Sequence, residues 1–136
     1  MNLLSIRIIT DNIEELVEFY GQVTGLPFVR YTADFAELKT PTATIAIGST
    51  KTLQFFGGND VALPAQNRSV IIEFRVEDVD KVYKRLADYL QGSIVQEPTT
   101  MPWGNKSLLF RDPDGNLVNF FTPTTPEAMA KFDRNQ

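Results

Sequence analysis

The 136-residue chain contains no histidine and no cysteine. Without cysteine it has no disulfide, no thiolate nucleophile and no thiolate metal ligand. Without histidine it has no imidazole base, no serine–histidine catalytic pair and no histidine-based metal site. Any binding or catalysis must therefore use carboxylates, amides, hydroxyls, aromatic rings and the side chains of lysine and arginine.

Charge and length exclude further classes of partner. The formal net charge is −4, the pI is about 4.8, and no basic cluster exceeds two adjacent residues. This composition predicts neither a nucleic-acid partner nor an anionic membrane surface. Met1–Arg7 has no basic flank of the kind found in signal peptides, and no apolar run approaches the length of a bilayer span. We expect one soluble, cytoplasmic domain whose ten phenylalanines partly line a cavity.

One pattern occurs twice along the chain. A shift of 66 residues places Leu4–Thr10 on Val70–Val76, and a shift of 65 places Leu53–Phe56 on Val118–Phe121. The first two segments alternate like strands, and a helical pattern follows each of them. The apolar residues at helical spacing are Ile13, Leu16, Val17 and Tyr20 in the first copy, and Val79, Val82, Tyr83 and Leu86 in the second.

The ends of both predicted helices carry recognisable capping residues. Asn12 and Glu15 predict a capping box, and Asp78 predicts an N-cap for the second helix. Gly25 and Gly92 occupy positions that favour closing a helix. The two copies therefore begin with the same strand–helix unit.

The remaining candidate strands complete two β-α-β-β-β modules. They are Phe28–Tyr31, Phe35–Lys39, Thr42–Ile47, Ile94–Gln96 and Lys106–Arg111. We expect an α+β fold in which two tandem modules form curved mixed sheets with helices outside. The predicted boundaries are about 3–57 for module one, 58–68 for the linker, 69–122 for module two and 123–136 for a tail with a helical pattern at Glu127–Phe132.

Three motifs connect this arrangement to a known superfamily. Phe110–Phe121 is a strand, a turn and a strand, in which Pro113 presets φ and Asp114–Asn116 tolerate positive φ. Thr10–Leu26 contains the D-x₇-F-Y pattern, with Thr24 where leucine is usual, and Met101–Asn105 contains a Trp-Gly run. Together they resemble the vicinal oxygen chelate superfamily, which includes glyoxalases, extradiol dioxygenases and bleomycin-resistance proteins.

The resemblance implies four metal positions around a concave cup. They fall on Ser5, Gln54, Ile71 and Asn119, where metal-dependent members use His, Glu or Gln. Only Gln54 keeps such a residue, and a hydroxyl, two amides and an isoleucine are a poor donor set for a divalent cation. We therefore predict no metal and no cofactor. Weak Mg²⁺ binding through Glu73 is the remaining alternative.

Strand alternation predicts which side chains meet a ligand. Leu4, Ile6 and Ile8 should pack under a helix, as should Ile72 and Phe74, which leaves the mixed faces to line the cup. The predicted ligand-binding residues are Arg7, Gln54, Phe56, Glu73, Arg75, Trp103, Asn119 and Phe121. In drug-binding relatives the loop that corresponds to Phe28, Tyr31 and Phe35 also contributes to the pocket.

Several of these residues admit a plainer interpretation. Arg7 and Glu73, equivalent in the two halves, either orient a polar ligand or form a solvated or interface ion pair. Trp103 either stacks on a planar ligand or covers the edge of the core. Glu73 is also the one candidate for a general base.

The leading hypothesis is metal-independent binding of a small, partly planar organic molecule by a homodimer. Such binding would sequester an antibiotic or a metabolite, as bleomycin-resistance proteins do. Because two arginines are predicted in the cup, an anionic or zwitterionic aromatic ligand fits better than a strongly cationic one. The alternatives are a metal-independent lyase or isomerase with Glu73 as base, and a structural dimer with a vestigial cup.

Overall fold

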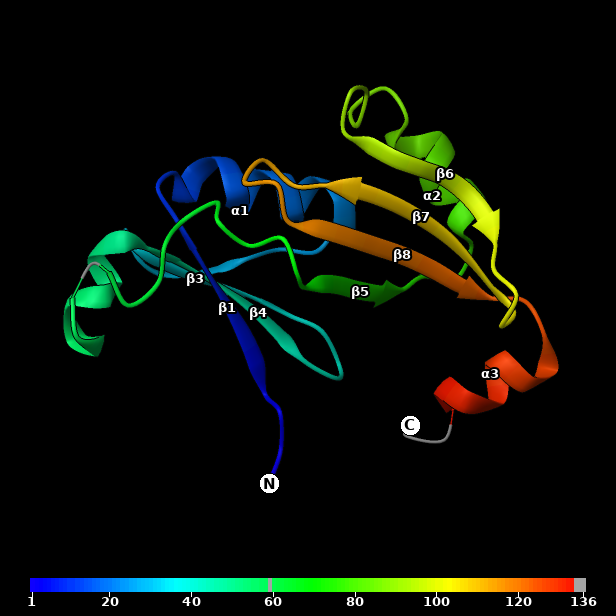
Figure 1. Cartoon of the computed structure of the whole chain (residues 1–136), viewed down its shortest axis with the longest axis horizontal. Helices are drawn as coiled ribbons and strands as arrows, with labels where there is room; N and C mark the ends of the chain where they lie inside the picture. Colours follow the sequence, from blue (N-terminus) through cyan, green and yellow to red (C-terminus); the bar gives the residue numbers. More distant parts are fainter. Residues whose placement is uncertain (59, 134–136) are drawn as a thin grey trace. The chain divides into compact units, whose positions relative to one another are not determined.

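The computed structural model describes residues 1–58 and 60–133, and the chain forms two compact units (Figure 1). Unit 1 comprises Met1–Asn67 with Pro113–Gly115, and unit 2 comprises Arg68–Asp112 with Asn116–Gln136. Each unit contains one four-stranded mixed sheet. Among the described residues, no helix combines the length and the apolar content needed to cross a membrane.

Unit 1 has the strand order β1-β4-β3-β2, with β1 parallel to β4 and the other neighbours antiparallel. The elements follow the predicted β-α-β-β-β order, with a 3-10 helix after the last strand. They are β1 (Ser5–Thr10), α1 (Ile13–Thr24), β2 (Val29–Thr32), β3 (Phe35–Lys39), β4 (Thr44–Ser49) and the 3-10 helix η1 (Thr50–Phe56).

Capping interactions set both ends of α1. The Asn12 side chain accepts a hydrogen bond from the Glu15 N–H at 3.2 Å and donates one to the Glu15 carboxylate at 3.2 Å. At the other end Gly25 has a φ of 70°, and its N–H donates to the Gly21 carbonyl at 2.9 Å. The predicted capping box and helix-closing glycine are confirmed. The helix buries Leu16, Tyr20 and Val23, and the sheet beneath contributes Ala36, Leu38, Ile45 and Ile47 to the core.

Unit 2 repeats this topology with the strand order β5-β8-β7-β6, and β5 is parallel to β8. The helix after β5 is capped by Asp78, whose side chain accepts hydrogen bonds from the N–H groups of Asp80 and Lys81. The elements are β5 (Ile71–Arg75), α2 (Val79–Leu86), β6 (Ile94–Thr100), β7 (Asn105–Arg111), β8 (Leu117–Pro123) and α3 (Pro126–Asp133). The α+β fold with two β-α-β-β-β units is therefore confirmed, and the tail carries the predicted helix.

The prediction of a strand at Leu53–Phe56 is wrong. These residues belong to η1, which begins where the Ser49 hydroxyl accepts the Lys51 N–H at 3.2 Å and ends at Gly57 with a φ of 107°. In unit 1 the place beside β1 is taken by β4, as β8 takes the place beside β5 in unit 2. The serine cap and the closing glycine therefore favour a 3-10 helix here, although the apolar run resembles a strand.

Two further expectations need correction. The second helix ends at Leu86 rather than near Gly92, because the chain continues in turns through residues 87–93 and Gly92, with a φ of 85°, lies just before β6. In β1, Leu4 and Ile6 were expected under a helix but are 72% and 43% exposed. The reason is that α1 packs on β3 and β4.

Candidate functional site

Unit 1 has a hollow on the sheet face opposite α1. Along β4 the two isoleucines point to α1, so Ala46 and Gly48 point to the other face. The strand register places Arg7 beside Ala46 and Phe35 beside Gly48. Arg7 and Phe35 project from this face. The small residues of β4 between them are covered, since Ala46 is 2% exposed and a methyl group added at Gly48 would meet side chains of Thr52, Ile9 and Arg7.

The β2–β3 turn and η1 close this hollow into a pocket of about 680 Å³. Its lining combines three phenylalanines with two cations, one carboxylate, one amide and two hydroxyls. The lining residues are Arg7, Thr32, Asp34, Phe35, Lys51, Thr52, Gln54, Phe55 and Phe56. All of them belong to unit 1.

Two aromatic rings hold the guanidinium of Arg7. Its central carbon lies over the Phe35 ring, 4.7 Å from the centroid, and over the Phe56 ring, 5.3 Å from the centroid. Both distances are within the range of cation–π attraction. The guanidinium forms no hydrogen bond or ion pair with any residue that the structure describes. Its N–H donors are therefore available to a ligand.

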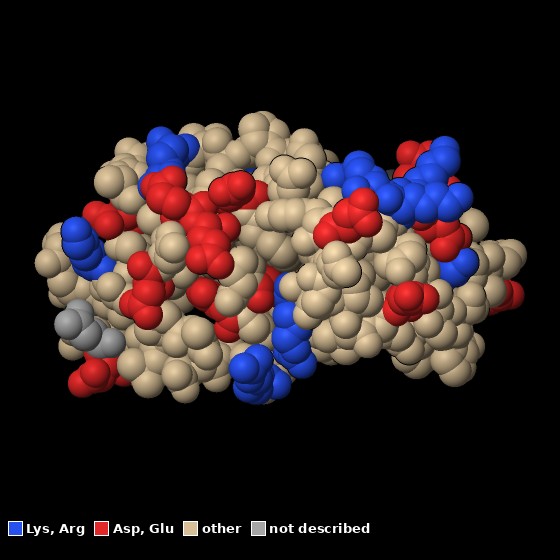
Figure 2. Space-filling view, turned by 90° about the horizontal axis from the view of Figure 1, so that it is seen from above, with Lys and Arg blue, Asp and Glu red and all other residues tan. Residues whose placement is uncertain are grey.

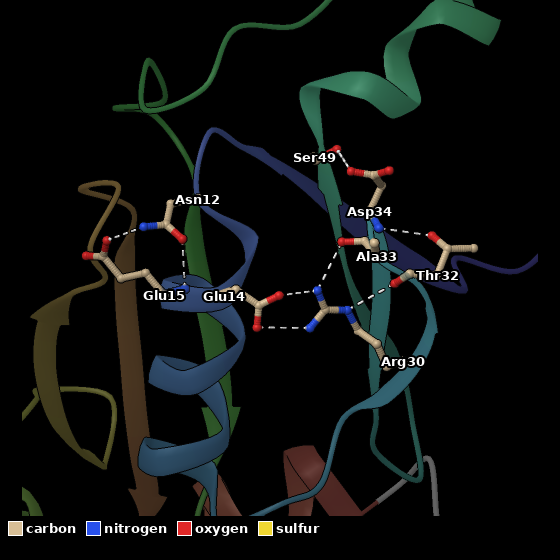
Figure 3. Close-up of polar contacts among 8 residues, drawn as sticks. All are labelled: Asn12, Glu14, Glu15, Arg30, Thr32, Ala33, Asp34 and Ser49. Carbon is tan, nitrogen blue, oxygen red and sulfur yellow. Dashed lines mark hydrogen bonds and ion pairs between the residues drawn. The ribbon is translucent and has the colours of Figure 1, made fainter.

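Hydrogen bonds connect the pocket wall to β4 and η1. The Ser49 hydroxyl donates to the Asp34 carboxylate at 2.7 Å, and the Thr52 hydroxyl donates to the Ser49 carbonyl at 2.8 Å. The Asp34 N–H donates to the Thr32 hydroxyl at 3.0 Å (Figure 3). Ser49 therefore binds Asp34 of the β2–β3 turn and also caps η1. These two contacts connect the turn and η1, which form two sides of the pocket.

Arg30 fixes the β2–β3 turn that supplies Thr32, Asp34 and Phe35. Its Nε donates to the Thr32 carbonyl and its Nη2 donates to the Ala33 carbonyl, both at 3.0 Å (Figure 3). The same guanidinium binds both oxygens of Glu14 on α1. The hydrogen bond and the charge of Arg30 hold the pKa of Glu14 below its ordinary value.

The net negative charge of the chain does not describe this pocket. Acidic side chains gather over α1 in Figure 2, where Glu14, Glu15 and Glu18 are exposed. That helix covers the opposite face of the sheet. The pocket itself combines Arg7 and Lys51 with the single carboxylate of Asp34. Its local charge is therefore positive.

Unit 2 fills the equivalent space with larger side chains. The parallel pair β5–β8 matches β1–β4, so Asn119 and Phe121 stand where unit 1 has Ala46 and Gly48. Phe121 is 6% exposed and lies 4.9 Å from the ring of Phe132 on α3. The two copies of the module have therefore diverged in side-chain size at equivalent positions of β4 and β8.

The predicted site residues divide between the units. Arg7, Gln54 and Phe56 line the pocket of unit 1, although Gln54 and Phe56 reach it from η1 rather than from a strand. In unit 2, Asn119 donates to Glu73 at 2.8 Å, and Arg75 forms an ion pair with Asp133 at 2.7 Å. Phe121 shares their sheet face. Trp103, in the loop between β6 and β7, is 66% exposed.

Sequence reasoning missed most of the polar lining. Lys51, Thr52 and Phe55 were hidden by the incorrect strand at Leu53–Phe56, and Thr32 and Asp34 lie in a short turn. The alternation Ile45-Ala46-Ile47-Gly48 was the signal that could have revealed the hollow. Of the three aromatics expected from the adjoining loop, Phe35 lines the pocket, whereas Phe28 and Tyr31 are not among its lining residues.

The strand register also changes the set of metal positions. The residue of unit 1 equivalent to Asn119 is Ala46, not Gln54. Ser5 and Ala46 of unit 1 offer one hydroxyl, and Ile71 and Asn119 of unit 2 offer one amide; neither pair fits a divalent cation. Among the described residues, no three carboxylates lie close enough together to hold a metal ion.

Comparisons with known proteins agree with this architecture. The chain is 29% identical over 125 residues to the uncharacterized protein YraH of Bacillus subtilis (strain 168), covering 89% of this chain and 98% of that protein. A glyoxalase/bleomycin resistance protein/dioxygenase family enzyme from Burkholderia phytofirmans PsJN superposes with a TM-score of 0.78 at 17% identity, covering 90% of this chain and 99% of that one. A glyoxalase/bleomycin resistance protein/dioxygenase from Nocardioides gives a TM-score of 0.74 at 21% identity, covering 93% and 85%.

At the level of sequence, the family model of the Glyoxalase/Bleomycin resistance protein/Dioxygenase superfamily matches residues 2–120. This range includes β1 at one end and most of β8 at the other, and therefore both β-α-β-β-β units. The chain belongs to the Glyoxalase/Bleomycin resistance protein/Dioxygenase superfamily.

Proposed function

We propose that this protein binds a small, partly planar organic molecule without a metal ion, and thereby sequesters an antibiotic or a metabolite. The observation that carries the proposal is the pocket of unit 1, where aromatic walls surround an arginine that has no carboxylate partner among the described residues. Its volume of about 680 Å³ suits a drug-sized molecule.

The composition of the lining supports binding of a planar ligand. Phe35, Phe55 and Phe56 supply apolar area and ring faces, and Phe55 and Phe56 are exposed. Aromatic rings stack on planar ligands with more attraction than burial of area alone provides. The Gln54 amide and the hydroxyls of Thr32 and Thr52 supply the few polar groups that orient such a molecule.

Binding has more support than a lyase or isomerase reaction with Glu73 as base. Glu73 lies in unit 2, where its carboxylate accepts a hydrogen bond from Asn119. The carboxylate in the pocket, Asp34, accepts one from Ser49. Among the described residues, neither carboxylate forms a hydrogen bond or an ion pair with a second ionisable group that would serve as the partner acid or base.

A homodimer is part of the same proposal. The edge strand β2 and the start of β1 leave apolar side chains in solvent, among them Leu4, Val29 and Tyr31. A second copy of the chain would cover such an edge. Light scattering coupled to size-exclusion chromatography should give twice the chain mass, and a monomer at high concentration would contradict the dimer.

A panel of planar compounds tested by isothermal titration calorimetry checks the binding function. Phe56→Ala should weaken any ligand found by roughly tenfold, because the stacking surface is lost. Leu63→Ala is the matched control, since it removes another exposed apolar side chain of unit 1 that does not line the pocket. Equal affinity of both variants for a validated ligand would place the site elsewhere. Chromatography of the recovered ligand should show no turnover.

A further inference from the structure

We propose that the pocket of unit 1 selects an aromatic carboxylate. Arg7 and Lys51 bind the carboxylate group, and Phe35, Phe55 and Phe56 contact the ring. This inference deepens the proposed function and rests on it, because it names the chemical class that the same pocket accepts.

The first argument is the state of Arg7. Both of its contacts in the pocket are with phenylalanine rings, which attract a cation but offer no lone pairs to its N–H groups. The guanidinium is therefore positioned while its hydrogen bonds remain available. A carboxylate matches the planar guanidinium in charge and shape, and it can accept two parallel N–H bonds.

The second argument is the charge of the lining. Arg7 and Lys51 carry two positive charges, and Asp34 carries one negative charge. The Lys51 ammonium has no ion-pair partner among the described residues. Glu37 shares the sheet face with Phe35, but it forms no ion pair with Arg7 and is not among the lining residues. The lining therefore carries one net positive charge. A monoanionic ligand would neutralise this charge, whereas a cationic ligand would be repelled by it.

The third argument comes from the duplication. Strand register makes Glu73 of unit 2 the equivalent of Arg7, so the charge at this position is reversed between the copies. Glu73 accepts a hydrogen bond from Asn119 of the neighbouring strand, whereas Arg7 lies beside Ala46, which has no polar group. The unpaired charge therefore belongs to the copy that keeps the hollow.

Three naphthalene derivatives with one ring system and different charges test the inference by calorimetry. 2-Naphthoate should bind at least tenfold more tightly than 2-naphthamide, and 2-naphthylmethylamine, a cation at neutral pH, should bind more weakly than both. Added salt should weaken binding of the carboxylate and leave binding of the amide nearly unchanged.

Variants assign the selectivity to the two cations. Arg7→Gln should weaken naphthoate at least tenfold and reduce its advantage over the amide to less than threefold. Lys51→Gln should weaken naphthoate several-fold. Lys39→Gln makes the same change of charge in unit 1 outside the pocket lining and should leave the affinity within twofold. If Arg7→Gln does not fold, the comparison of Lys51→Gln with Lys39→Gln still tests the inference.

Failure of this inference is distinguishable from failure of the proposed function. If the amide or the amine binds as tightly as naphthoate, and Phe56→Ala weakens that binding, the pocket binds planar molecules but does not select carboxylates. If none of the three binds at millimolar concentration, the carboxylate inference is overturned, and the compound panel decides the proposed function separately. Equal effects of Lys51→Gln and Lys39→Gln would also overturn it, because only general charge would then matter.

Discussion

Gly48 of β4 leaves room for Thr52 and Arg7, two residues that line the pocket of unit 1. A methyl group added at this position would lie 2.9 Å from the Thr52 hydroxyl oxygen, 3.5 Å from the Ile9 side chain and 3.6 Å from the Arg7 side chain. The first distance is shorter than real contacts allow, and the Thr52 hydroxyl is already engaged with the Ser49 carbonyl. The smallest possible enlargement of β4 therefore displaces residues of the pocket.

Gly48→Ala should weaken ligand binding by about tenfold and lower stability by about 1–3 kcal/mol, because a packed region is overfilled. Calorimetry and chemical denaturation measure the two effects. Gly21→Ala is the control, because its methyl group would meet only the Leu26 carbonyl at 3.9 Å. In a helix this change should stabilise by about 0.5–1 kcal/mol and leave binding unaltered. Wild-type affinity in Gly48→Ala would show that the placement of Thr52 and Arg7 does not affect the ligand site.

The ion pair of Glu14 with Arg30 makes a pH-dependent contribution to stability. Because the pair lowers the pKa of Glu14 in the folded protein, its contribution is complete above the ordinary glutamate value of 4.5 and is lost as the pH falls through the lower folded value. Glu14→Gln should therefore lower the melting temperature at pH 7, and its difference from wild type should shrink as the pH falls below 4.5.

Thermal melts across this pH range, monitored by circular dichroism, measure the effect. Glu18→Gln is the matched control, since it removes the same charge from α1 at a residue with no ion-pair partner among the described residues. A constant difference between Glu14→Gln and wild type at every pH would show that the carboxylate charge does not matter.

At the scale of elements, η1 depends on a serine that acts in two directions. Ser49 accepts the Lys51 N–H and donates its hydroxyl to Asp34. Ser49→Ala should cost about 0.5–2 kcal/mol through the lost cap and should also weaken ligand binding, because η1 carries Lys51, Gln54 and Phe56. Ser49→Thr, which keeps the hydroxyl, should restore both. Recovery of neither would indicate that volume, not hydrogen bonding, matters at this position.

Elements were predictable from the sequence where local signals and periodicity agreed. Asn12 with Glu15 marked the start of α1, and the turn at 112–116 marked the hairpin of β7 and β8, where the Asp112 carboxylate accepts the Asn116 N–H. At Leu53–Phe56 an apolar run suggested a strand. Which segment pairs with β1 is decided by long-range contacts, and β4 takes that place. The run itself does not encode this outcome. The pocket wall that η1 builds was missed for that reason.

The site was only partly predictable for a related reason. Alternation placed Arg7 correctly on the face opposite the helix, because the period of a strand is local information. Asp34, Lys51 and Thr52 reach the pocket from a turn and a 3-10 helix, whose positions depend on tertiary packing. Gly48 supports the pocket only by leaving room for Thr52 and Arg7, and a search for reactive side chains passes over such a position.

At the scale of the whole chain, the available donor groups decide the metal content. The protein as purified should contain no stoichiometric transition metal and should melt identically in chelator, because the chain has no histidine and no cysteine and no three carboxylates lie close together among the described residues.

Elemental analysis of the purified protein and thermal melts with and without chelator measure these two expectations. One Zn, Ni, Fe or Mn per chain, lost in chelator together with stability, would contradict them.

The alternation along β4 has a consequence for how the ligand preference of this protein can change over generations. Ile45 and Ile47 belong to the buried layer under α1, whereas Ala46 and Gly48 lie on the opposite face, from which Arg7 and Phe35 project into the pocket. An enlarged side chain at Gly48 would displace Thr52 or Arg7 of the pocket wall without removing any contact beneath the helix. Selection can therefore adjust which molecule fits while the folding core is left intact, and unit 2, with Asn119 and Phe121 at these places, shows how far such substitution has gone in the other copy.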